Sequence, residues 1–198
     1  MQGDLFANFT GNEPGEAKNS NLATLETLNC DYQLIDTEEK RTKIIQKLLT
    51  SKILSLDTET TGTEPMDAEL VGMSFSIAEN EAFYVPVPAD QEEALKIVNE
   101  FRPVFENENS LKVGQNIKYD MIVLQNYGVQ VKGPLFDTMI AHYVLQPELR
   151  HGMDYLAEIY LRYQTIHIDE LIGPKGKNQK NMRDLAPKDV YRYACEDA

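Results

Sequence analysis

The sequence predicts an α/β domain in which a mixed β-sheet is flanked by helices. Its first half carries apolar runs of strand character that are joined by short polar turns. Its second half alternates segments of helical apolar spacing with one more short strand. Strands followed by alternating helices are typical of a sheet that is covered by helices. The chain has 198 residues, which is enough for one domain with its own core.

The predicted strands are short apolar runs bounded by turn residues. They are DYQLID from residue 31, ILSLD from residue 53, ELVGMSFSIA from residue 69, EAFYVPVP from residue 81 and LKVG from residue 111. The polar turn at residues 79–81 joins the third run to the fourth. We therefore expect ILSLD and the two runs after it to form a three-stranded antiparallel meander.

Helical spacing of apolar residues fills most of the remaining chain. The first helix follows Asp36, which with Glu39 resembles a capping box. Gly128 and Pro187 mark helix boundaries, because glycine favours a left-handed helix end and proline the first helical position. The other expected helices cover residues 91–105, 116–127, 137–145 (capped by Asp137) and 153–163, and the last runs from residue 187 to the end of the chain.

The composition limits the class of protein. The net charge of −13 argues against a basic nucleic-acid groove, although carboxylates can approach phosphate through bound cations. No apolar run approaches the roughly 20 residues of a membrane helix, so we expect no membrane partner. Cys30 and Cys195 fit no metal or redox spacing, which favours a reducing cytoplasm. Residues 1–22 lack an apolar period and are expected to form a flexible lead or linker.

Two carboxylates stand at the end of the strand ILSLD. Asp57 and Glu59 are two residues apart, so in a strand they project from the same face, while Leu54, Leu56 and Thr58 face the other way. Like charges this close oppose each other's ionisation, and a divalent cation would offset the repulsion. For a motif this short, a frayed strand end with both carboxylates in water is the more common explanation.

Two predicted helices carry further polar pairs. Asn116 and Asp120 are four residues apart and share a helix face, which we expect to lie opposite Ile117 and Leu124. Tyr193 and Asp197 have the same spacing on the last helix. Either pair alone would be an ordinary solvated face. Together with Asp57 and Glu59 they supply four carboxylates from three elements, as two-metal phosphodiester hydrolysis requires.

The motifs DTETTG, GQNIKYD and YRYACED follow one another at residues 57–62, 114–120 and 191–197. In order and spacing they resemble the three motifs of the DEDD-type 3′→5′ exonucleases. With the segments between them, they resemble the proofreading domain of bacterial family A DNA polymerases, over residues 31–198. The likeness implies a ribonuclease H-like fold and an exonuclease domain over residues 23–198. The spacing of Tyr193 and Asp197 is that of the tyrosine subtype.

The resemblance also implies roles for individual residues. Two divalent metal ions, Mg²⁺ or else Mn²⁺ or Zn²⁺, would be held by Asp57, Glu59, Asp120 and Asp197. Tyr193, with Glu59, would orient the attacking water. The substrate would be the single-stranded 3′ end of DNA, and the product a nucleoside 5′-monophosphate. The positions that would contact this strand are Thr60, Gln115, Asn116, Tyr119 and Arg150.

Some features depart from the family or leave its implications open. Two positions that hold the terminal base are bulky and apolar in the family, and here they are Thr63 and Ile168. The lysine-rich loop at residues 173–181 fits strand binding and a solvated loop equally well. The family's last helix continues past Asp197 towards a polymerase domain. We therefore expect the domain to be truncated at its C-terminal helix, with that polymerase domain, in the same bacterial parent chain, as its partner.

Two other functions compete with the leading one. The first is a ribonuclease D-like exonuclease that acts on RNA, against which the polymerase-like segments between the motifs argue. The second is a non-catalytic scaffold domain. Retention of all four carboxylates and of Tyr193 argues against that reading.

Overall fold

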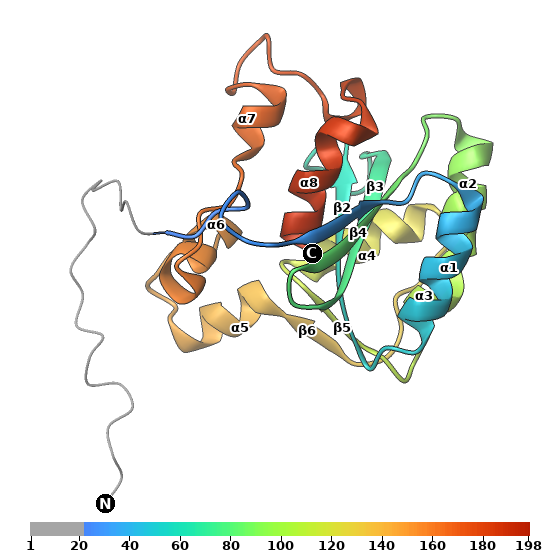
Figure 1. The fold of residues 1–198 in the computed structure, drawn as a ribbon, viewed down its shortest axis with the longest axis horizontal. Helices are drawn as coiled ribbons and strands as arrows, with labels where there is room; N and C mark the ends of the chain where they lie inside the picture. Colours follow the sequence, from blue (N-terminus) through green and yellow to red (C-terminus); the bar gives the residue numbers. More distant parts are fainter. Residues whose placement is uncertain (1–21) are drawn as a thin grey trace, which may run out of the picture.

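The computed structural model describes residues 22–198, and residues 1–21 of the predicted lead lie outside them (Figure 1). Within the described residues, six strands form one sheet in the order β1-β4-β3-β2-β5-β6. The strands are β1 (Asp31–Leu34), β2 (Ile53–Thr60), β3 (Leu70–Ala78), β4 (Glu81–Pro86), β5 (Leu111–Gly114) and β6 (Leu135–Asp137). Strands β2, β3 and β4 pair antiparallel, and the other three pairs are parallel. The predictions of a mixed sheet and of a three-stranded meander are confirmed.

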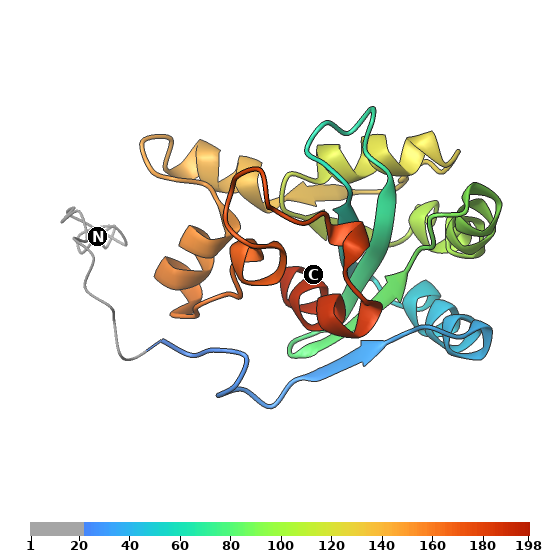
Figure 2. The same cartoon turned by 90° about the horizontal axis from the view of Figure 1, so that it is seen from above.

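Helices cover both faces of this sheet (Figures 1 and 2). The longer ones are α1 (Glu38–Leu49), α2 (Gln91–Glu100), α4 (Ile117–Asn126), α5 (Thr138–Leu145) and α8 (Pro187–Asp197). The shorter ones are α3 (Arg102–Phe105), α6 (Met153–Leu156), the π-helix η1 (Ala157–Leu161), α7 (Ile168–Ile172) and the 3₁₀-helix η2 (Met182–Asp184). No helix of the described residues is long and apolar enough to cross a membrane.

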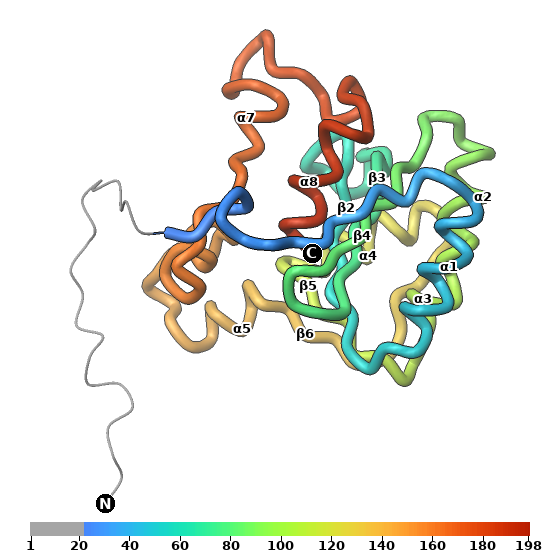
Figure 3. The backbone as a smooth tube through the Cα atoms, viewed as in Figure 1, coloured from blue at the N-terminus to red at the C-terminus, as the bar shows by residue number. Residues whose placement is uncertain are grey.

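Two apolar clusters lie on opposite faces of the sheet. The larger cluster packs α1, α2, α3 and α4 against Leu54 and Leu56 of β2 and their neighbours on β3 and β4. The smaller cluster packs Val190, Ala194 and Cys195 of α8 against the other face. The chain therefore returns at its end to contact β1, β2, β3 and β4 from the side opposite α1 (Figure 3).

The structure corrects several predicted element boundaries. Thr37, not Asp36, caps α1, because its hydroxyl accepts the Lys40 backbone N–H at 3.3 Å. Asp36 instead forms an ion pair with the Lys40 side chain at 2.7 Å. The predicted helix 91–105 is divided at Phe101 into α2 and α3. Pro103 lies in the first turn of α3, and its missing N–H prevents an unbroken ladder of helical hydrogen bonds.

The second half of the chain contains elements that the pattern did not indicate. Strand β6 has only three residues and helix α7 only five, too few for a recognisable period. The predicted helix 153–163 becomes α6 followed by η1, and it ends where Arg162 adopts a left-handed φ of 52°. Gly128, with φ 75°, closes α4 as expected, and Asp137 caps α5 through the Ile140 N–H.

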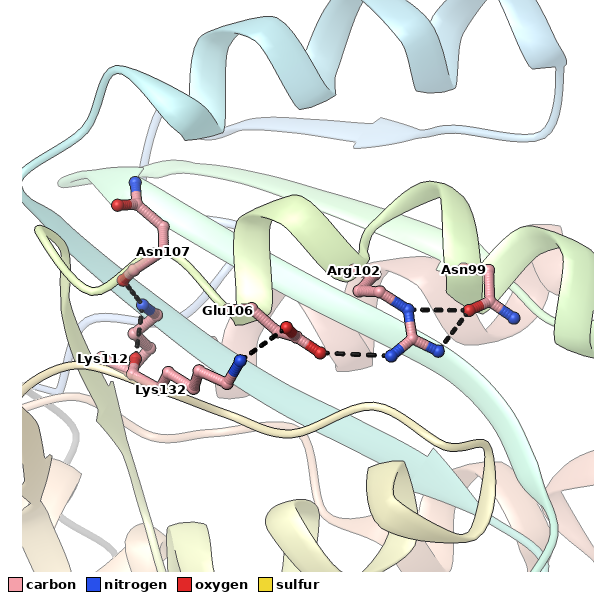
Figure 4. Close-up of polar contacts among 6 residues, drawn as sticks. All are labelled: Asn99, Arg102, Glu106, Asn107, Lys112 and Lys132. Atoms are coloured by element: carbon pink, nitrogen blue, oxygen red, sulfur yellow. Dashed lines mark hydrogen bonds and ion pairs between the residues drawn. The ribbon is translucent and has the colours of Figure 1, made fainter.

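A polar cluster anchors β5 to its surroundings (Figure 4). The fully buried Lys112 ammonium donates to the carbonyl oxygens of Asn107 and, at 2.7 Å, of Lys132. Burial lowers the pKa of this lysine. Beside it, Glu106 bridges Lys132 at 2.8 Å and Arg102 at 3.2 Å. These contacts tie the end of α3 and the segment before β6 to strand β5.

Gly72 of β3 lies opposite Glu59 of β2 in the antiparallel ladder, beside the buried ring of Tyr84. A Cβ atom at Gly72 would overlap that ring, whereas one at Gly62 would meet no atom within 4 Å. We expect Gly72→Ala to lower the free energy of unfolding by about 1–3 kcal/mol, the usual cost of overpacking. The control Gly62→Ala should change it by less than about 0.5 kcal/mol. Urea denaturation measures both, and equal midpoints for the two variants would contradict the expectation.

Candidate active site

Strand β2 places two carboxylates on one face of the sheet. Leu54 and Leu56 lie in the larger core cluster, so the alternating Asp57 and Glu59 point to the face covered by α8. Glu59 is buried, with 6% of its surface exposed. The alternation predicted from the sequence is therefore confirmed for these positions.

Asp197, at the end of α8, completes an acidic cluster with these two residues. Carboxylate oxygens of Asp57, Glu59 and Asp197 all lie within 4.8 Å of one another. The cluster joins residues that are 140 positions apart in the sequence. The packing of α8 across the sheet is what brings them together.

Asp120 lies on α4, which packs on the face of the sheet opposite α8. Its Oδ1 accepts a hydrogen bond from the Thr58 hydroxyl at 2.6 Å. It does not belong to the group of three carboxylates whose oxygens lie within 4.8 Å of one another. It is near enough for its charge to raise the pKa of both Asp57 and Glu59. No sequence pattern indicated this contact of Thr58, which was expected only to face the core.

The predicted face of α4 is wrong in one respect. Asp120 is 2% exposed and lies on the same buried face as Ile117 and Leu124, not opposite them. Residues three and four apart on a helix are neighbours, and Asp120 stands three after Ile117 and four before Leu124. Asn116 precedes the helix in a left-handed conformation with φ 60°, so it does not share that face by helical spacing.

The electrostatics of the cluster follow from burial and mutual repulsion. Burial, together with the charges of Asp197 and Asp120, raises the pKa of Glu59 to about 8. Burial raises the pKa values of Asp120 and Asp197 to about 7 each. The pKa of Asp57 also lies well above its ordinary value, first because of burial and then because of the three neighbouring carboxylates.

Tyr193 lies one turn before Asp197 on α8. A hydrogen bond from its hydroxyl lowers the pKa of Asp197, against the larger effect of burial. The pKa of Tyr193 is itself raised far above its ordinary value by burial and by the charges of Asp197 and Glu59. The phenol is therefore protonated at neutral pH and can donate a hydrogen bond beside the cluster.

The positions expected to contact substrate fall into two pairs and one separate residue. Thr60 and Tyr119 meet at 2.6 Å between their hydroxyl oxygens, and both also bond to the Gly62 carbonyl. Gln115 accepts from Thr138 at 2.5 Å and donates to the His151 carbonyl at 2.6 Å. The neighbouring Asn116 donates its N–H to the Asp137 carboxylate at 3.2 Å.

The remaining positions lie on the surface. Arg150 is exposed in the segment between α5 and α6. Thr63 is also exposed, and Ile168, at the start of α7, is 43% exposed. The structure thus joins Thr60 with Tyr119 and Gln115 with the start of α5, and it shows no side-chain hydrogen bond for Arg150 within the described residues.

The acidic cluster fits a divalent cation. Hard cations such as Mg²⁺ prefer oxygen ligands, and carboxylates are their usual protein ligands. Oε1 of Glu59 is buried and has no hydrogen-bond partner among the described residues. A buried acceptor without a partner is costly, and a bound cation would satisfy it. The three carboxylates therefore form a candidate metal site.

Comparisons with known proteins identify the sequence family of the chain. A family described as 3′-5′ exonuclease matches residues 32–198. The chain is 32% identical over 189 residues to DNA polymerase I of Borreliella burgdorferi, and 34% identical over 195 residues to DNA polymerase I of Pseudomonas aeruginosa. Each alignment covers 94% of this chain but only 20% and 21% of these relatives. The chain thus spans about a fifth of the length of the curated relatives it matches.

Solved structures show the same fold at lower identity. Escherichia coli RNase D, an exoribonuclease involved in structured RNA processing, has a TM-score of 0.64 at 18% identity, covering 85% of this chain and 41% of that one. Brucella melitensis NrnC with bound Mg²⁺ has a TM-score of 0.61 at 18% identity, covering 86% and 75%. The fold is therefore ribonuclease H-like, as the resemblance implied.

The family match spans most of the chain, and both polymerase relatives exceed 30% identity over nearly its whole length. On this ground, the chain belongs to the 3′–5′ exonuclease family whose members include the exonuclease domains of DNA polymerase I.

Proposed function

We propose that residues 23–198 form the proofreading exonuclease domain of a bacterial DNA polymerase I that works in the cytoplasm. The domain would hydrolyse the terminal phosphodiester of a single-stranded 3′ DNA end and release nucleoside 5′-monophosphates. The observation that carries this proposal is the cluster of Asp57, Glu59 and Asp197, with Asp120 close by. The polymerase domain of the same parent chain would be its partner.

The proposed metal ligands are residues of this cluster. Asp57, Glu59 and Asp197 would hold one divalent ion, and Asp57 with Asp120 would hold a second. Mg²⁺ is the first choice, with Mn²⁺ and Zn²⁺ as alternatives. When bound, the ions would supply positive charge for the attacking and leaving oxygens of an in-line displacement. The like charges of the carboxylates, unfavourable when left together, would then be neutralised.

The protein's own residues would orient the reactants. Tyr193, protonated and beside both Asp197 and Glu59, can hold the attacking water by a hydrogen bond. Thr60 and Tyr119 would contact the terminal nucleotide, and the aromatic ring of Tyr119 offers a stacking surface for a base. Gln115, Asn116 and Arg150 would contact sugar and phosphate, which are the usual targets of amide and guanidinium groups.

DNA is favoured over RNA by the sequence relatives. The curated relatives at 32% and 34% identity are DNA polymerases. The similarity to RNase D supports the fold alone, because its identity is 18%. An RNA exonuclease of the ribonuclease D type is thus the second candidate. A scaffold without catalysis does not account for four acidic side chains held together against their repulsion.

Removal of one ligand charge should abolish the reaction. We expect Asp57→Asn to lower the rate of monophosphate release from a labelled single-stranded 3′ end by more than about a thousandfold, because cation binding contributes several kcal/mol to the transition state. Asp67→Asn, a change at an exposed aspartate, is the matched control and should retain the wild-type rate. Equal rates for the two variants in Mg²⁺ would refute the assigned role of Asp57.

Substrate choice separates the two enzyme candidates. We expect the wild-type chain to shorten a single-stranded DNA oligonucleotide from its 3′ end faster than the RNA of the same sequence. EDTA should stop the reaction, because the cluster acts only with its cations. The measurement is product length on a denaturing gel over time. Faster cleavage of the RNA would favour the ribonuclease D-like function instead.

The raised pKa values predict how stability depends on pH and metal. Glu59, with a pKa of about 8 in the fold against an ordinary 4.5, binds its proton more tightly when folded. Its stabilising contribution is complete below about pH 4.5 and is lost as the pH rises through 8. In EDTA we therefore expect the melting temperature to fall from pH 6 to pH 8. Mg²⁺ should raise the melting temperature more at pH 8 than at pH 6.

The variant Glu59→Gln provides the control for this titration. It removes the ionisable group, so its melting temperature in EDTA should fall less between pH 6 and pH 8 than that of the wild type. Thermal melting followed by circular dichroism measures both slopes. The same slope in the two proteins would show that Glu59 does not carry the effect.

A further inference from the structure

The last turn of α8 carries two adjacent carboxylates that contact different neighbours. Asp197 belongs to the acidic cluster with Asp57 and Glu59. Glu196 instead accepts a hydrogen bond from the Tyr163 hydroxyl and another, at 2.6 Å, from the Ile166 backbone N–H. Successive helical residues point about 100° apart, so one turn can serve both sites. Both Glu196 oxygens are thereby used outside the acidic cluster.

The segment that Glu196 contacts is itself anchored. Residues 163–166, called the connector below, run from the end of η1 towards α7. The Gln164 N–H donates to the Ala23 carbonyl at 2.9 Å, and the Thr165 hydroxyl donates to Asp154 of α6 at 2.8 Å. The connector is therefore held from two sides that do not involve α8. It offers the end of α8 a fixed support.

Asp197 needs such a support because its neighbours in the cluster repel it. Before any cation binds, the charges of Asp57 and Glu59 oppose its approach. In the same turn Cys195 packs in the smaller core cluster, and Glu196 adds two hydrogen bonds to the connector outside the acidic cluster.

We propose that Glu196 is a positioning residue, which holds the last turn of α8 against the connector and so keeps Asp197 directed at Asp57 and Glu59. The proposal deepens the proposed function and rests on it for the identity of the metal site. The connector continues into α7, which begins at Ile168. The same contact therefore also sets the place of α7 relative to the acidic cluster.

Four variants separate this role from general stability. Glu196→Ala removes both hydrogen bonds, and Tyr163→Phe removes only one. Glu196→Gln keeps an oxygen acceptor for the Ile166 N–H and an amide that can donate to the Tyr163 hydroxyl. Arg192→Gln is the control on the same helix, because it breaks only an exposed ion pair with Glu26. Exposed ion pairs contribute little to stability.

The measurement is a Mg²⁺ titration with two readouts, the rise in melting temperature and the rate of monophosphate release. We expect Glu196→Ala to need about tenfold more Mg²⁺ for the half-maximal effect in both, as is usual when a residue that orients a metal ligand is lost. Tyr163→Phe should shift the midpoint in the same direction by less. Glu196→Gln should stay close to the wild type. A purely structural role would lower the melting temperature without moving the Mg²⁺ midpoint.

The outcomes distinguish this proposal from the function it rests on. If Glu196→Ala has the same Mg²⁺ midpoints as Arg192→Gln, the positioning role is overturned. If Glu196→Ala does not fold, the midpoint of Tyr163→Phe decides in the same way. If the wild type releases no monophosphate but its Mg²⁺-dependent melting shifts in Glu196→Ala, the positioning role stands and the proposed exonuclease function fails.

Discussion

The fold of this domain has to hold mutually repelling carboxylates close together. Three acidic side chains offer oxygens within 4.8 Å of one another, and a fourth is close enough to raise the pKa of two of them. Such a group opposes folding unless protons or cations neutralise it. The surrounding packing must therefore hold the ligands in place before any cation binds. A site arranged in this way is ready for a cation without a large rearrangement.

The two faces of the sheet hold different parts of the acidic site in place. On one face, the larger core cluster fixes β2 through Leu54 and Leu56, so that the alternate residues must face α8. On the other face, the smaller cluster fixes α8 through Val190, Ala194 and Cys195. Both clusters include residues of the central strands β3 and β4. The distance between β2 and α8 is therefore set by packing and not by the carboxylates themselves.

The substrate side of the site is supported by polar contacts. The amide of Gln115 is held by Thr138 and by the His151 carbonyl, and Asp137 receives the N–H groups of Asn116 and Ile140. The start of α5 therefore organises the segment between β5 and α4. Sites built on such supporting contacts keep their geometry better than sites on free loops. In the proposed function, this rigidity would place a 3′ terminus relative to the acidic cluster.

Local sequence patterns were enough to predict the features that depend on neighbours along the chain. The two-residue period of β2 fixed the common face of Asp57 and Glu59, and the four-residue spacing on α8 fixed the pairing of Tyr193 with Asp197. The antiparallel meander followed from three apolar runs with a short turn between the last two. The motifs also indicated the family correctly, because their order and spacing can be recognised in the sequence alone.

Which distant groups meet depends on tertiary packing, and local patterns could not predict it. Strand β6 and helix α7 are too short to show a recognisable hydrophobic period. They are stabilised by contacts with their neighbours, β6 with β5 and α7 with α8. Three contacts join segments that are separated by at least 30 positions. They are the contacts of Asp120 with Thr58, of Glu196 with the connector and of Asp197 with the carboxylates of β2. Such contacts depend on how helices pack across the sheet, and that packing is a property of the whole core and not of any local pattern.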